Sequence, residues 1–134
     1  MNENYLHSEI TSRIIKAYYQ VYNTLGYGFL EKVYENAMLI ELKKMGLDCT
    51  NQKPVKVYYD GEVVGSYSAD IFVCEKVIIE LKAAVSLCAK DEAQLINYLK
   101  GTEIEVGMLL NFGSTPQYKR KVFSNKFKNL INHN

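Results

Sequence analysis

The stretch of sequence that decides the fold is Val77-Ile78-Ile79-Glu80-Leu81-Lys82-Ala83. It opens with three β-branched residues, which favour strands. Side chains alternate between the faces of a strand, so Glu80 and Lys82 share one face with Ile78, and the other face is apolar. A strand this apolar is typical of the centre of a sheet that is covered on both faces. A carboxylate buried there needs compensation, which either a metal ion or an ion pair would supply.

The length and composition of the chain favour one soluble domain. Its 134 residues fit a single domain spanning residues 1–134, with enough chain to bury a core. No apolar run approaches the roughly 18 residues of a membrane span. The N-terminal sequence has no basic region followed by an apolar core, so no signal peptide is expected. The three cysteines are widely spaced, as reduced thiols in a cytosol would be. We therefore predict a cytoplasmic protein.

The net charge is +1, but the charge is distributed unevenly. After Glu105 there is no acidic residue, and the tail carries five basic ones, which are Lys119, Arg120, Lys121, Lys126 and Lys128. A local basic face can bind phosphate even when the whole chain is nearly neutral. A solvated C-terminal edge is the alternative, and charge alone favours that alternative.

The pattern of apolar residues predicts three helices and five strands. We expect helices at residues 8–25, 30–45 and 90–100. We expect strands at residues 53–59, 62–73, 77–83, 105–112 and 118–123, with a last helical turn at 125–131. The second helix would bury a stripe of Val33, Ala37, Ile40 and Lys44, beside Leu30, Tyr34 and Met38. The third would turn Ala93, Ile96 and Tyr98 or Leu99 inward. This order implies an α/β fold with one mixed central sheet flanked by helices.

A second acid, Asp70, lies in an apolar strand that precedes the Glu80 strand. Asp60-Gly61 is a strong hairpin signal for the two earlier strands, and residues 74–76 form a second short connection. A turn centred near residue 75 would place Asp70 directly across from Glu80, with Cβ atoms roughly 4.5–5.5 Å apart. Two carboxylates at that distance repel each other unless a cation lies between them. Oxygen ligands favour a hard ion such as Mg²⁺ or Mn²⁺.

These residues resemble a known family. Asp70, nine intervening residues and Glu80-Leu81-Lys82 resemble the bipartite motif of the PD-(D/E)XK nuclease superfamily, with Ala69 in place of the proline. Residues 28–34, with Gly28, Glu31 and Tyr34, are similar to the motif that names the GxxExxY branch. Gln94 and the segment 106–112 resemble the helix and strand that follow in that branch. The resemblance covers about residues 8–125 and implies a restriction-endonuclease-like fold.

The resemblance also implies roles for individual residues. Asp70 and Glu80 would bind Mg²⁺ or Mn²⁺ through side-chain oxygens, and the Leu81 carbonyl would be a further ligand. Lys82 would position or activate the attacking water. Glu31 would complete the acidic cluster, directly or through water, and Gln94 would support the site from the third helix. The function implied is a metal-dependent deoxyribonuclease, a phosphodiesterase acting on DNA.

Other interpretations of the same residues remain open. Glu80 and Lys82 could form a plain ion pair on an exposed strand face, and Glu31 could be a helix N-terminal acid favoured by the macrodipole. The chain could be a non-catalytic nucleic-acid-binding or partner subunit, or a structural interaction module whose ion pair only fixes the sheet. Its small size suggests that a homodimer or a partner protein supplies any DNA specificity.

Overall fold

A computed structural model of the chain describes residues 6–128. The elements in chain order are α1 (Ser8–Leu25), α2 (Glu31–Lys44), β1 (Cys49–Tyr59), β2 (Glu62–Val73), β3 (Val77–Lys82), α3 (Ala89–Lys100), β4 (Val106–Phe112), β5 (Pro116–Val122) and the short 3₁₀ helix η2 (Asn125–Phe127). The predicted order of helices and strands is confirmed.

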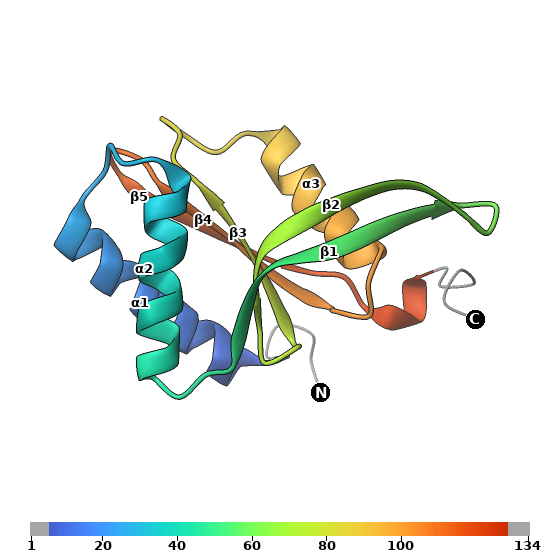
Figure 1. The fold of residues 1–134 in the computed structure, drawn as a ribbon, viewed down its shortest axis with the longest axis horizontal. Coiled ribbons are helices and arrows are strands. Elements are labelled where there is room, and N and C mark those ends of the chain that lie inside the picture. The colour runs from blue at the N-terminus through green and yellow to red at the C-terminus, as the bar shows by residue number, and fades with distance from the viewer. Residues whose placement is uncertain (1–5, 129–134) are drawn as a thin grey trace.

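The strands form one five-stranded mixed sheet in the order β1-β2-β3-β4-β5. β3 and β4 are parallel, and the other neighbouring pairs are antiparallel. A parallel pair needs a crossover connection, and α3 supplies it. β1 and β2 form a long hairpin that arches past α3 (Figure 1). β3 is therefore central, as its apolar sequence predicts, and the predicted α/β class is confirmed.

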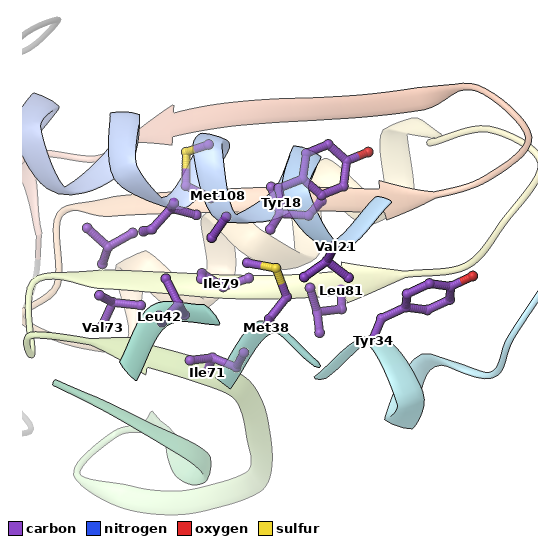
Figure 2. Packing of buried hydrophobic residues seen from close by; sticks show 14 of the residues in the cluster. Tyr18, Val21, Tyr34, Met38, Leu42, Ile71, Val73, Ile79, Leu81 and Met108 are labelled. Atoms are coloured by element: carbon purple, nitrogen blue, oxygen red, sulfur yellow. The ribbon is translucent and has the colours of Figure 1, made fainter. Parts of the chain in front are cut away.

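α1 and α2 cover one face of the sheet with a large apolar cluster. Figure 2 shows Tyr18 and Val21 of α1 and Met38 of α2 above Ile79 and Leu81 of β3. α2 ends at Lys44, and two residues later Gly46 has a left-handed φ of 78°. Leu47 N–H then donates to Leu42 O at 3.0 Å, which closes the last turn.

α3 covers the other face with a smaller cluster of buried residues, which are Val55, Ala69, Phe72, Ile78, Leu95, Tyr98, Leu99 and Leu109. The helix lies close to β4 at Gly107, where a Cβ atom would come 2.7 Å from Leu95 Cδ1. Glycine at this position therefore lets α3 pack closely against the sheet.

The structure corrects the predicted inward faces of two helices. α2 buries Tyr34, Glu35, Met38 and Leu42, whereas Val33 and Ile40 of the predicted stripe are exposed. Tyr34, Met38 and Leu42 recur every four residues and form the buried stripe, and Glu35 beside them accepts hydrogen bonds from Asn51 and Gln52 of β1. α3 buries Leu95, Tyr98 and Leu99, while Ala93 is exposed.

The last predicted element is described only in part. The predicted turn at 125–131 is present as η2, and residues 129–131 lie outside the described residues. Within residues 6–128, no helix is both long and apolar enough to cross a membrane.

Candidate active site

Asp70 and Glu80 lie together where β2 and β3 separate. The antiparallel register pairs Val73 with Val77 and Ile71 with Ile79, and Asp70 and Glu80 follow one position beyond the last pair of this ladder. At that next position the side chains replace the ladder bonds. The Asp70 N–H donates to Glu80 Oε1 at 3.1 Å, and the Leu81 N–H donates to Asp70 Oδ2 at 2.7 Å. The two carboxylates are thus held by each other's strands.

Burial and mutual repulsion make this carboxylate pair weakly acidic. Glu80 is only 6% exposed. Burial and the nearby Asp70 charge raise the pKa of Glu80 to about 8. Burial also raises the pKa of Asp70, and the negative charges of Glu35 and Glu31 raise it further. Glu80 therefore holds a proton near neutral pH unless a cation offsets the charge.

Lys82 follows on the same face of β3 and pairs with an acid on α3. Its Nζ lies 3.9 Å from Asp91 Oδ1. Asp91 also accepts a hydrogen bond from the Cys88 N–H at 3.1 Å as part of a capping box, so the start of α3 fixes the carboxylate that faces the lysine. The Lys82 charge lowers the pKa values of both Asp70 and Glu80, although burial outweighs it.

The loop after Lys82 is fixed by a buried amide of β4. Asn111 is fully buried, and its side chain accepts from the Ala84 N–H and donates to the Ala84 carbonyl, both at 3.0 Å. Lys82 is paired with Asn111 in the parallel β3–β4 register. The polar residue in the otherwise apolar β4 thus sets the direction in which the chain leaves β3.

The remaining predicted site residues are Glu31, Leu81 and Gln94. Glu31 is exposed at the start of α2, and its charge raises the pKa values of Asp70 and Glu80. Leu81 is buried and lies between Glu80 and Lys82 in the sequence. Gln94 is exposed on α3, and its Nε2 donates to the Tyr98 hydroxyl at 2.9 Å. Burial raises the pKa of Tyr98, and the nearby negative charge of Glu80 raises it further.

Glu35 is a further acid near the site that the sequence pattern missed. Its carboxylate is buried and accepts hydrogen bonds from Lys32 at 2.9 Å, Asn51 at 3.1 Å and Gln52 at 2.7 Å. Burial acts to raise the pKa of Glu35, but these three donors together outweigh it and lower the pKa. Asn51 and Gln52 are exposed polar residues, so nothing in the sequence singled them out as the partners of Glu35.

Gln52 also marks an irregularity in the sheet opposite Asp70. Its φ of 55° is left-handed, which is uncommon for a residue other than glycine. The β1–β2 ladder pairs Asn51 with Ile71 and Lys53 with Ala69 but omits Gln52 and Asp70. The alternation of side chains along β2 is interrupted at this point. Ile71 packs under α1 and α2, whereas Ala69, two residues earlier, packs under α3. Asp70 therefore lies where β2 bends over α3.

The donor set at Asp70 and Glu80 fits a hard cation. Each carboxylate uses one oxygen for a backbone N–H, and neither Asp70 Oδ1 nor Glu80 Oε2 receives a hydrogen bond from residues 6–128. A divalent cation would offset the repulsion that raises both pKa values. No third acid, histidine or cysteine of the described chain joins them in a metal-binding cluster, so further ligands would be water, backbone or substrate oxygens.

Comparison with known proteins identifies the family. The chain matches the family model of the PD-(D/E)XK nuclease superfamily over residues 8–122. The crystal structure of SSO0001 is similar with a TM-score of 0.52 and 16% sequence identity, covering 69% of this chain and 50% of that one. This chain thus spans about half the length of that protein, and the likeness concerns the fold alone. No curated protein matches the chain. From the family match, the chain belongs to the PD-(D/E)XK nuclease superfamily.

Proposed function

We propose that the protein is a Mg²⁺- or Mn²⁺-dependent nuclease that hydrolyses phosphodiester bonds in DNA, within the GxxExxY branch of the superfamily. The observation that carries this proposal is the Asp70–Glu80 pair, in which Asp70 is half-buried and Glu80 is buried with its pKa raised to about 8, and Lys82 lies on the same strand face. Nucleases of this superfamily generally use divalent metals and act on nucleic acid. We also propose that residues 1–134 work as one domain.

Asp70 and Glu80 would hold the cation, with the Leu81 carbonyl as an additional donor and Glu31 acting through a bound water. A bound divalent cation supplies a more acidic water and stabilises negative charge on the scissile phosphate. The backbone hydrogen bonds to Asp70 Oδ2 and Glu80 Oε1 orient the two carboxylates before the cation arrives. This pre-orientation reduces the reorganisation that binding would otherwise require.

Lys82 would donate a hydrogen bond to the attacking water or to a phosphate oxygen. Asp91 holds its ammonium from the other side, at 3.9 Å. A lysine fixed between a carboxylate and the substrate can place the water in line with the phosphorus and stabilise the charge that develops there. Gln94 would act indirectly, because its hydrogen bond holds Tyr98 near Glu80.

The test is a cleavage panel of end-labelled single-stranded DNA, duplex DNA, flapped DNA and RNA, with Mg²⁺, Mn²⁺ or EDTA. We expect metal-dependent cleavage of at least one DNA form. Lys82→Ala should lower the rate by about 10²–10⁴-fold, the range for loss of a proton-transfer or water-positioning group. Lys90→Ala, at an exposed lysine in the first turn of α3, is the matched control and should retain activity.

Equal cleavage by wild type and Lys82→Ala would trace the activity to a contaminant. Binding of DNA with no cleavage under any metal would instead favour a non-catalytic subunit. In that case a homodimer or partner protein would have to supply the chemistry.

A further inference from the structure

A pocket of about 490 Å³ lies at the loop that follows Lys82, and the proposed mechanism does not use it. Three segments line it, which are residues 27–31, 83–85 and 112–114. It shares Glu31 with the candidate active site and begins one residue after Lys82. The parallel strands β3 and β4 both end here, and the crevice outside the carboxyl ends of parallel strands is where ligands bind in open α/β sheets. We call it the 27–31 pocket.

The walls of the 27–31 pocket are fixed by the core. Its floor is Phe112, whose ring stacks on Tyr34 with the centroids 4.1 Å apart and the planes at 13°. The Tyr34 hydroxyl donates to the Gly26 carbonyl at 2.8 Å and accepts from the Phe29 N–H at 3.2 Å, which holds the loop between α1 and α2. Gly113 passes so close to the loop after β3 that a Cβ atom would lie 2.3 Å from Ala84 O. The pocket is therefore preformed.

The rim of the 27–31 pocket exposes large apolar side chains to solvent. Tyr27 is 63% exposed, Phe29 46%, Leu30 81% and Val85 91%. Single exposed apolar residues are common, but several gathered around one hollow indicate a binding surface. Two of the four are aromatic and can present a ring face to a flat ligand.

We propose that the 27–31 pocket binds an unpaired nucleobase of the strand whose phosphate lies at Asp70 and Glu80. The base stacks against both Tyr27 and Phe29, and Leu30 and Val85 cover its edges. This inference rests on the proposed function and specifies its substrate. A base inside a continuous duplex is paired and stacked, so it enters the pocket only after unstacking. The preferred substrates are single strands, flaps or frayed ends.

The test measures binding rather than cleavage, by fluorescence anisotropy at low salt in EDTA. The probes are a labelled 12-nucleotide oligodeoxythymidine, an abasic strand with the same phosphates, and a blunt duplex of the same length. Stacking of one base on an aromatic ring corresponds to a change in affinity of roughly 5- to 150-fold. We expect the wild type to bind oligodeoxythymidine tighter than the abasic strand by a factor in this range, and the blunt duplex more weakly than oligodeoxythymidine.

Substitutions at the rim test whether the pocket causes the preference for the base-bearing strand over the abasic strand. Tyr27→Ala should remove most of it, and Tyr27→Phe should keep it because the ring remains. Tyr59→Ala is the matched control, since Tyr59 is a 75% exposed tyrosine at the far end of the β1–β2 hairpin. Phe29→Ala should act like Tyr27→Ala, with its melting temperature measured to show that it folds.

Three outcomes would overturn the proposal. These are equal affinity of the wild type for the base-bearing and abasic strands, no detectable binding of either strand, or an unchanged base preference in Tyr27→Ala. In the third case, a change of oligomeric state in Tyr27→Ala would identify the rim of the pocket as a self-association surface. Base-dependent binding without metal-dependent cleavage would support the pocket and remove the nuclease proposal. Cleavage that requires Lys82 but is unchanged in Tyr27→Ala would support the nuclease proposal and remove the base-binding pocket.

Discussion

The two faces of the central strands differ sharply in what they carry. Towards α1 and α2, the ends of β3 and β4 present Leu81, Leu110 and Phe112, all buried in one apolar cluster. Towards α3, the ends of the same two strands present three polar residues, which are Glu80, Lys82 and Asn111. The apolar cluster on this face stops at Ile78 and Leu109.

This difference separates stability from chemistry within one sheet. The face under α1 and α2 supplies the apolar burial that holds the fold, so the face under α3 can carry charges that cost stability. Buried carboxylates that repel each other are retained at functional sites at the expense of stability. Substitutions on the two faces of a single strand should therefore have opposite effects.

The largest expected effect on stability comes from Leu81, which is 1% exposed in the cluster under α1 and α2. Leu81→Ala should lower the free energy of unfolding by about 2–5 kcal/mol, because it removes buried methyl groups and leaves a cavity. Urea denaturation measures the change, with Glu80→Gln as the neighbouring control on the other face. A loss in Glu80→Gln as large as that in Leu81→Ala would contradict the separation of the two faces.

The next effect is a dependence of stability on pH that belongs to Glu80. Its pKa rises from 4.5 to about 8 on folding, so the unfolded chain binds fewer protons between these values. Stability without metal should therefore fall as the pH rises from about 5 to about 8. The raised Asp70 pKa acts in the same direction and the lowered Glu35 pKa in the opposite one.

Urea denaturation in EDTA across this pH range checks the assignment. Glu80→Gln should flatten the slope relative to the wild type, because glutamine does not titrate. A slope of equal size in both proteins would show that Glu80 is not the titrating group.

The smallest expected effect on stability comes from Asp70→Asn. The asparagine Oδ1 can still accept from the Leu81 N–H, and the repulsion between Asp70 and Glu80 is removed. We expect the metal-free protein to be as stable as the wild type or slightly more so. Thermal unfolding in EDTA measures this, and a loss of several kcal/mol would indicate a structural ion pair instead.

The sequence predicted the parts of the site that depend on strand alternation and turn length. The order of elements, the Asp60-Gly61 hairpin and the alignment of Asp70 with Glu80 follow from local patterns. The burial of Glu35 on α2 does not, because its partners Asn51 and Gln52 on β1 are distant in sequence. Tertiary hydrogen bonds of this kind override a count of apolar residues along a helix.

The sequence also did not predict the bend of β2 at Asp70 or the pairing of Lys82 with Asp91. The left-handed backbone of Gln52 has no glycine or asparagine to announce it. The pairing of Lys82 with Asp91 depends on where α3 begins, and the residues at a helix end are the least reliable part of a sequence-based prediction. Asn111 was visible as a polar residue in an apolar strand, in the same way as Glu80.

The most direct test of the central claim is the effect of Mg²⁺ or Mn²⁺ on the melting temperature of three proteins. A cation bound only by the folded state raises the melting temperature of the wild type by a few degrees at millimolar concentration. Asp70→Asn and Glu80→Gln, which keep the backbone hydrogen bonds and lose a charge, should show little or no shift. The same shift in all three proteins, or none in the wild type, would contradict a metal site at this carboxylate pair.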